Sequence, residues 1–321
     1  MNKLNIVVDT MGGDLGPDAV TQGAIWAAKD LSDAELTLVG PETAVKESLA
    51  KFGSPGEHIH FLHAPDVILP GESPTLAVRR KKESSIVVGL KYVKEGHATG
   101  FVSAGSTGAV LTGATVIIGR RKGIERPALG TLLPTPKGFT LLLDSGANMD
   151  CKPNYLLQFG QIGTEYMQKC MGIKNPRVGL INVGAEGEKG NTLAKEAYVL
   201  LKASSLNFVG NIEGREIPGG DADVAVCDGF VGNIVLKYTE GLAKTIMGMI
   251  KEELTATRIS KIGAFMAKGA FGRLKKRFDY REVGGAPFLG LNQIVVKAHG
   301  SSDALAVKNA IRQAVIISRS E

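Results

Sequence analysis

The sequence predicts an α/β protein with a largely parallel sheet that helices cover on both faces. Short apolar runs of strand length alternate along the chain with stretches in which apolar residues recur at helical spacing. At least six of these runs end in a small polar or acidic residue, with glycine at most a few positions beyond. The 321 residues are 44% hydrophobic and include 41 glycines, which allows a sizeable core joined by tight turns.

The expected strands leave room for helices between them. In chain order they are 4–8, 36–39, 101–102, 139–143, 177–181, 206–209, 224–227 and 294–297. We expect one helix opened by Pro17, a basic helix over 77–94, and a last helix that runs to about Ile317. This pattern favours one α/β domain over 1–321.

The most informative stretch is Asp223–Gly241, which is typical of a strand, a tight turn and a helix. Gly229 and Gly232 remove side chains where the helix begins, so its free N–H groups could meet an anion directly. Asn233 adds an amide that can donate and accept hydrogen bonds. The alternative is an ordinary connection that glycine keeps short.

Similar loops follow the other strands, and together they predict a binding cleft. In a parallel sheet these loops meet at one edge, where ligands bind. The expected phosphate- or substrate-binding residues are Asp9, Gly12, Gly13, Ser103, Gly105, Ser106, Thr107, Asp144, Asn148, Asn182, Asn211, Asp228, Gly229 and His299.

Several other kinds of site are not indicated. The dinucleotide fingerprint, the P-loop triplet and an evident Ser–His–Asp set are all missing from the sequence. The three cysteines have no paired spacing, and His58, His60 and His63 are expected on a strand and loop at the surface. We therefore expect no cofactor and no metal.

The start of the chain enters a strand directly and has no signal-peptide pattern, and the longest nearly uncharged run, 105–119, is shorter than a spanning helix needs. We expect a cytoplasmic protein. Nucleic acid is not an expected partner, because aromatic residues do not interleave with the basic ones.

One lysine stands out among these loops. Lys189 lies in the glycine-rich stretch 184–191, where it could reach a bound oxyanion. A solvated lysine in a flexible loop is an equally good interpretation. Glycines, amides and one lysine together suit an inorganic or organic phosphate.

Seven motifs then resemble those of one known family, the bacterial phosphate acyltransferases (PlsX), from end to end and in the same order. They are VVDTMGGD at 7–14, SAGSTGA at 103–109, ERPALG at 125–130, LLDSGANMDCKP at 142–153, GNIEGRE at 210–216, CDGFVGNIVLKYTEG at 227–241 and GGAPFLGLN at 284–292. One departure is Ser106, where the family usually has asparagine.

The resemblance implies transfer of a fatty acyl group from acyl carrier protein to inorganic phosphate, giving acyl phosphate for phospholipid synthesis. It implies a three-layer α/β/α sandwich with a mixed sheet, similar to the isocitrate and isopropylmalate dehydrogenases, and a homodimer. A mixed sheet would qualify the largely parallel one expected from the residues. It also implies peripheral action at the inner face of an anionic membrane, beside a downstream membrane acyltransferase.

The residue chemistry suits that reaction. Phosphate is already an anion near pH 7, and a thiolate with a pKa of ~8.5 leaves readily, so neither general acid nor general base is essential. We expect Lys189 and Asn233 to be the catalytic residues, which neutralise charge and orient the thioester. Asp9, Asp144 and Asp228 are expected to fix loops, and Cys227 to be an inert packed thiol.

The charge surplus of the chain is concentrated in 251–281, where nine basic and three acidic residues give +6, the net charge of the whole chain. Core packing explains the apolar residues there but not the charge. We favour an amphipathic helical segment that contacts an anionic membrane or the acidic carrier protein. Its expected contact residues are Ile262, Phe265, Lys268, Lys275, Lys276 and Arg277.

Two alternative functions stay open on the sequence alone. One is a phosphate acyltransferase that uses small acyl groups on coenzyme A. The other is a non-catalytic scaffold that binds membrane and carrier protein. Phosphate-dependent release of thiol from acyl carrier protein separates them.

Overall fold

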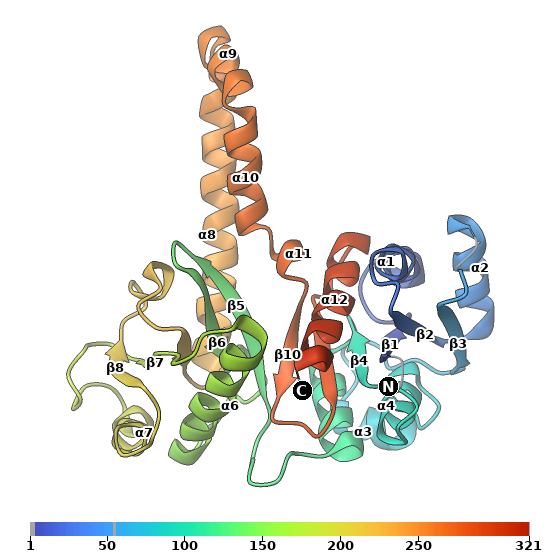
Figure 1. Cartoon of the computed structure of the whole chain (residues 1–321), viewed down its shortest axis with the longest axis horizontal. Helices are drawn as coiled ribbons and strands as arrows, with labels where there is room; N and C mark the ends of the chain where they lie inside the picture. Colours follow the sequence, from blue (N-terminus) through green and yellow to red (C-terminus); the bar gives the residue numbers. More distant parts are fainter. Residues whose placement is uncertain (1–3, 54–55, 321) are drawn as a thin grey trace.

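The structure is a computed structural model that describes residues 4–53 and 56–320, and its strands form one eleven-stranded sheet (Figure 1). The strand order is β3-β2-β1-β4-β11-β10-β5-β6-β9-β7-β8. The strands are β1 Leu4–Asp9, β2 Ala34–Gly40, β3 Ile59–His63, β4 Gly100–Ser103, β5 Ala128–Thr135, β6 Gly138–Leu143, β7 Val178–Ile181, β8 Phe208–Ile212, β9 Val224–Val226, β10 Gly285–Leu289 and β11 Ile294–Ala298.

Helices cover both faces of this sheet. α1, α6, α7 and α12 pack on one face, and α3, α4 and α5 pack on the other. The helices are α1 Gly16–Asp30, α2 Glu42–Phe52, α3 Pro74–Arg80, α4 Ser85–Lys94, α5 Thr107–Gly113, α6 Pro153–Met171, α7 Thr192–Lys202, α8 Gly229–Ala256, α9 Arg258–Met266, α10 Lys268–Phe278, α11 Tyr280–Val283 and α12 Ala304–Ser320, with short η1 Ala114–Ile118 and η2 Ile217–Gly219.

Strand direction reverses in the middle of the sheet. Seven of the ten described ladders are parallel, and the three antiparallel ones join β10 to β11, β10 to β5, and β5 to β6. β1–β4 and β11 therefore run opposite to β6–β9. The sheet is mixed and mostly parallel, as the family resemblance implies. The prediction that all the strand-end loops meet at one edge is wrong, because the two half-sheets end at opposite edges.

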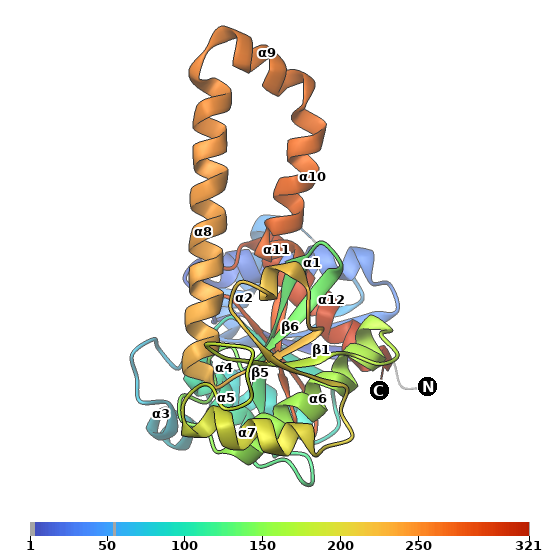
Figure 2. The ribbon, with the colours of Figure 1, turned by 90° about the vertical axis from the view of Figure 1, so that its left-hand side faces the viewer.

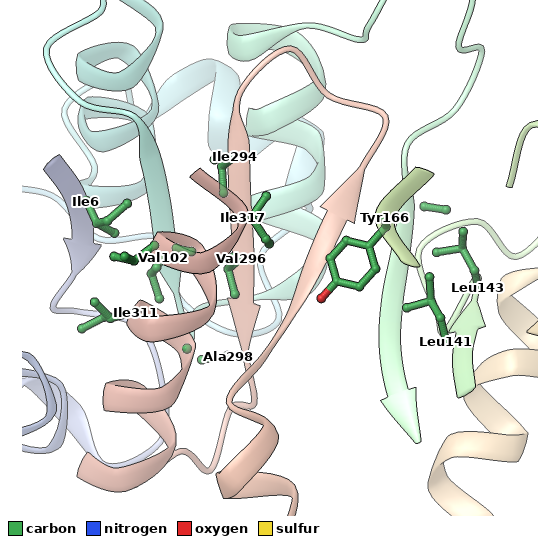
Figure 3. Close-up of a cluster of buried hydrophobic side chains, with 14 of the residues drawn as sticks. Ile6, Val102, Leu141, Leu143, Tyr166, Ile294, Val296, Ala298, Ile311 and Ile317 are labelled. Carbon is green, nitrogen blue, oxygen red and sulfur yellow. The ribbon is translucent and has the colours of Figure 1, made fainter. Parts of the chain in front are cut away.

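The core lies on both faces of the strands because successive side chains alternate. In β1, Ile6 and Val8 pack toward α1 and α12, whereas Val7 packs toward α4. Figure 3 shows the first of these clusters, where Ile311 of α12 lies beside Ile6 and Val102. Most of the apolar strands found in the sequence are thus central strands buried on both sides, whereas β8 is an edge strand and only partly buried.

The structure differs from the elements expected from the sequence in three respects. The helix expected over 77–94 is interrupted between α3 and α4, because Lys81 donates to Val67 O and Glu72 and so ties the break to the preceding loop. Asn211 lies inside β8 and does not follow a strand end. Strands β5 and β10 were not anticipated.

Helix α8 begins where glycines allow the closest backbone contacts. A Cβ on Gly232 would lie 1.8 Å from Asp144 O, and one on Gly229 would lie 2.6 Å from Asn148 O. The N–H groups of both glycines are already used, since Gly229 N donates to Asn148 O and Gly232 N to Asp228 O, and Val231 N donates to Asp228 Oδ1. The glycines here serve packing, and the expectation that their N–H groups are free to meet an anion is wrong.

Helices α8, α9 and α10 form an arm that projects from the sheet (Figures 1 and 2). Among the described residues of α8 only Gly229 and Gly232 are buried, and α9 buries none. The turn from α8 to α9 is fixed by a capping box of Thr257 and Ser260. Core packing therefore does not explain the apolar residues of the basic segment.

We predict that Gly232→Ala destabilises the fold by about 3 kcal/mol or more, because backbone must move to admit the methyl group. Gly241→Ala in the same helix meets nothing within 4 Å and should stabilise by ~0.5–1 kcal/mol. Urea denaturation of both variants checks this. Equal effects would show that the contact with Asp144 does not constrain the start of α8.

Candidate functional site

A cavity of about 360 Å³, here called the front cavity, lies between α8 and the two half-sheets. β11 and the loop after it contribute Lys297 and His299, and the loop after β6 contributes Ser145 and Gly146. Lys237 of α8 bridges the two sides, with its Nζ 3.1 Å from His299 Nε2. The strand reversal thus places residues from opposed half-sheets against one helix.

The most unusual group in the cavity lining is Lys297, which is only 7% exposed. Its ammonium donates to Ala104 O at 3.2 Å and to Ala298 O. Burial lowers the pKa of Lys297 to about 8, although the charges of Asp9 and Asp14 oppose the shift. Sequence reasoning missed this residue, and the available signal was a lysine in an otherwise apolar strand.

Lys237 and His299 form the exposed side of the same polar group. Partial burial and the Lys237 charge lower the pKa of His299 below its ordinary value, so the imidazole is neutral near pH 7. Lys237 also donates to Glu240 Oε2 at 3.1 Å. The sequence analysis did not single out Lys237, although it follows Asn233 by four residues and so shares its helix face.

Asn233 lines the front cavity close to the loop after β6. Gly146 has φ +134°, and a Cβ there would lie 3.4 Å from Asn233 Oδ1. Glycine is therefore required by the backbone conformation, whereas the approach to Asn233 is an ordinary van der Waals contact. Thr107, at the start of α5, also lines the cavity.

The loops after β1 and β4 are joined behind the cavity. Asp9 accepts hydrogen bonds from Ser103 Oγ at 2.7 Å and Met11 N at 3.1 Å, and Ser103 Oγ accepts one from Gly105 N. Burial raises the pKa of Asp9, and its hydrogen bonds counter the shift. A Cβ on Gly12 would lie 2.4 Å from Gly105 N, which leaves no room for another residue.

Two residues of these loops also lie near the cavity. Gly13 has φ +97°, and a Cβ there would lie 3.1 Å from the carbonyl oxygen of Gly300, which lines the cavity. Ser106 precedes the first residue of α5. The loops after β1, β4 and β11 thus form one side of the site.

Asp144 organises the loop after β6 through four backbone N–H groups, those of Leu129, Gly146, Ala147 and Asn148. Asn148 Nδ2 also donates to it at 2.8 Å. Burial raises the pKa of Asp144, and these donors oppose the shift. Asp228 caps α8. The expectation that the three carboxylates accept backbone N–H bonds is confirmed.

Three expected site residues form a separate group around the 184–190 loop. Asn182 Nδ2 donates to Lys189 O at 3.1 Å, and Asn211 Nδ2 donates to Glu186 O at 2.7 Å. The side chain of Lys189 is exposed. Within the described residues, this group is not part of the front cavity lining.

Cys227 is 3% exposed, and its thiol points to Asp144 O at 3.7 Å. Burial raises the pKa of Cys227 well above its ordinary value, with the Asp144 and Asp228 charges adding to the shift. The prediction of a packed thiol is confirmed, and its inertness in the reaction stays a prediction.

Fold and cavity define an α/β protein with a polar site made of lysines, a histidine and an amide, which suits an anionic ligand.

A family model described as "Fatty acid synthesis protein" matches residues 4–321. Curated phosphate acyltransferases are close relatives. That of Clostridium beijerinckii is 53% identical over 315 residues, 98% of this chain and 95% of the relative. That of Clostridium perfringens (strain SM101) is 51% identical over 312 residues, 97% and 92% of the two chains. The chain therefore belongs to the phosphate acyltransferase family of fatty acid and phospholipid synthesis, and it is an enzyme.

Solved structures show the same fold at low identity. A phosphotransacetylase from Streptococcus pyogenes has a TM-score of 0.65 at 18% identity, covering 100% of this chain and 96% of that one. A branched-chain phosphotransacylase from Enterococcus faecalis V583 has a TM-score of 0.59 at 15% identity, covering 99% and 100%.

We predict a pH-dependent stability difference between the protein and its Lys297→Met variant. The pKa of Lys297 is about 8 when folded, against an ordinary value of 10.5, so the unfolded chain binds more protons between these pH values. The free energy of unfolding of the unmodified protein should therefore rise relative to the variant from about pH 8 to about pH 10. Urea denaturation across that range checks it.

The exposed Lys244→Met serves as the matched control and should show no such divergence. If the free energies of unfolding of the protein and of Lys297→Met differed by the same amount over the whole pH range, the result would contradict a buried ammonium at this position.

Proposed function

We propose that the enzyme transfers a fatty acyl group from acyl carrier protein to inorganic phosphate, releasing acyl phosphate for phospholipid synthesis. A phosphate oxygen attacks the thioester carbonyl carbon, the C–S bond breaks, and the thiol of the carrier leaves as thiolate. The observation that carries the proposal is the cluster of Lys297, Lys237 and neutral His299 in one cavity.

This cluster supports phosphate as the nucleophile. Phosphate is anionic near pH 7 and requires no base, so the main tasks are to position it and to stabilise the oxyanion formed by its attack. A lysine in a nearly dry setting attracts an anion more strongly than one in water. Direct attack is also supported by Cys227, because its buried thiol is unsuited to forming an acyl-enzyme.

We assign orientation of the thioester carbonyl to Asn233, which faces this cluster from α8. The expected binding residues of the loops after β1, β4 and β6 hold the walls of the site. We keep for Lys189 the proposed role of neutralising charge. Among the described residues, its loop is not part of the front cavity lining, so this role needs a test of its own.

Phosphate-dependent release of thiol from acyl carrier protein is the decisive assay. Removing one oxyanion donor costs ~10²–10³-fold in turnover, so Asn233→Ala and Lys189→Ala should each lose that much. Cys227→Ser should retain activity. Parallel assays with acetyl-coenzyme A test the small-acyl alternative.

Release of thiol that does not depend on phosphate would refute the proposed reaction. Activity near that of the unmodified enzyme in Asn233→Ala or Lys189→Ala would refute the role of that residue alone. Inactivity on every acyl donor would favour the scaffold.

The arm supports the proposed homodimer. Leu242, Ile246 and Met249 of α8 are 44–62% exposed and recur at helical spacing. An apolar stripe of this kind on a projecting helix is a favourable surface for a second copy of the chain.

Two expectations about the fold also stay proposals. One is the kinship to the isocitrate and isopropylmalate dehydrogenases. The other is a single domain over 1–321, which the continuous sheet supports.

We further propose that the tip of the arm contacts an anionic membrane at its inner face, near a downstream membrane acyltransferase. In the described residues, no helix is long and apolar enough to span a bilayer. In α9, Ile259, Ile262 and Phe265 are 64–83% exposed, and Lys268 opens α10. Lys276 and Arg277 lie at the base of the arm, and the Lys275 side chain lies outside the described residues.

Flotation with vesicles that contain phosphatidylglycerol tests the tip. We expect Phe265→Glu to reduce binding about tenfold, because burial of an aromatic side chain contributes ~1.5–3 kcal/mol. Val199→Glu, on exposed α7, should bind like the unmodified protein. Unchanged flotation of Phe265→Glu would exclude this helix as the contact.

A further inference from the structure

A second cavity, here called the rear cavity, has a volume of about 450 Å³ and lies on the α6 and α12 side of the sheet. Its walls include Leu132, Phe139, Met171, Val283 and Ile316, which give it an apolar interior. Each of the two cavities falls within the ~300–1,000 Å³ typical of ligand sites. The chemistry described above does not use the rear cavity.

The two cavities meet at an opening in the sheet, here called the window. The described ladder between β5 and β10 consists of Phe288–Leu129 and Leu289–Ala128. Beyond it, Gly285–Pro287 pair with β11, and Gly130–Thr135 pair with β6. The strands therefore separate toward α11, and Figure 3 shows the ribbons of β10 and β5 diverging in that direction.

The window is closed at its wide end by the base of the arm. Arg277 Nη2 donates to Thr135 O at the end of β5. Arg281 Nη1 donates to Asp303 Oδ2 at 2.8 Å, next to the start of α12, and Asn309 Nδ2 donates to Arg281 O. The segment between α10 and β10 is thus fixed on both sides of the opening.

Three residues line both cavities, namely Leu132, Arg277 and Val283. Two of them are apolar, so the boundary between the cavities is formed largely by hydrocarbon. In the front cavity, the polar group of Lys297 and His299 lies at the end of β11, and Leu132 and Leu133 come from β5 beside the window. A ligand with a polar head and an apolar tail matches this order.

We propose that the acyl chain of the substrate passes through the window and ends in the rear cavity, while its carboxyl carbon stays in the front cavity. This inference rests on the proposed function. An extended sixteen-carbon chain is roughly 17 Å long, since it has fifteen C–C bonds and three bonds of extended chain span ~3.4 Å. Packed layers lie only ~10 Å apart, so such a chain is long enough to cross the sheet.

The mouth of the rear cavity is basic. Arg273, Lys276 and Arg312 lie there with Arg277, and Glu282, 3.8 Å from Lys276, is the one acidic residue among the described residues of the lining. Aliphatic parts of these long side chains can cover the far end of a hydrocarbon chain while their charged ends reach water. The occupant of the apolar interior is therefore the acyl chain, whose length this cavity limits.

The experiment compares acyl groups of four and sixteen carbons. Ile316→Trp and Phe139→Trp fill the rear cavity from positions that are 36% and 37% exposed, which favours correct folding. We expect at least about a tenfold fall in the ratio of kcat/KM for the long chain to that for the short chain. Val199→Trp on exposed α7 is the matched control and should leave the ratio unchanged.

A second measurement uses the unmodified enzyme and does not depend on how the variants fold. A sixteen-carbon substrate with a diazirine at its far end should label Phe139, the end of α6 or the second half of α12. Labelling confined to α8, or an unchanged chain-length ratio in both folded variants, would overturn the inference. Absence of phosphate-dependent thiol release from the unmodified enzyme with any chain would instead overturn the proposed function.

Discussion

The reversal of strand direction at β5 and β10 is the constraint on which the rest of the structure depends. Two parallel half-sheets of opposite direction cannot end at one edge, so their loops meet only where a helix crosses between them. α8 does this, because its first turn packs against Asp144 O at Gly232 and its second and third turns face the end of β11. Within the same reversal, the ladder between β5 and β10 has two residue pairs, whereas the one between β5 and β6 has six, so the sheet is least paired between β5 and β10.

Burial decides what each charged group in the site does. Asp9 and Asp144 are enclosed by hydrogen-bond donors and hold loops, so their charge is used inside the protein. Lys297 is nearly as enclosed, and among the described residues its hydrogen-bond partners are carbonyl oxygens. Burial lowers its pKa even though the charges of Asp9 and Asp14 oppose the shift, so a bound anion would further stabilise the ammonium. The site therefore suits a negatively charged ligand that can react without help from a general base.

Much of the fold was predictable because it follows from local patterns. The apolar strands and the Asp228–Gly229 turn were found, since burial on both faces and a helix cap leave clear signals. β5 and β10 were missed. β5 is half-buried beside the opening, and β10 contains Gly285 and Pro287, which are unfavourable strand residues. The sequence carries no direct signal of strand direction.

Part of the site was also predictable, because some of its residues lie in local sequence patterns. His299 was found because it follows the end of β11, and Asn233 because it lies in the early turns of the helix after β9. Lys237 was missed because it lies further along that helix, and Lys297 because it lies inside a strand. Their importance depends on the tertiary contact between α8 and β11. Conversely, Gly229 was read as a ligand contact, and its packing against Asn148 O explains it instead.

The arm and the reaction site are mechanically connected. α10 carries the tip helix α9 at one end, and Arg277 near its other end binds Thr135 O and borders both cavities. Val283, a few residues further, borders both as well. A displacement of α10 relative to the sheet must therefore change either the hydrogen bond to β5 or the width of the opening beside it. The helix that continues from the exposed apolar tip thus contributes a residue, Arg277, to the lining of both cavities.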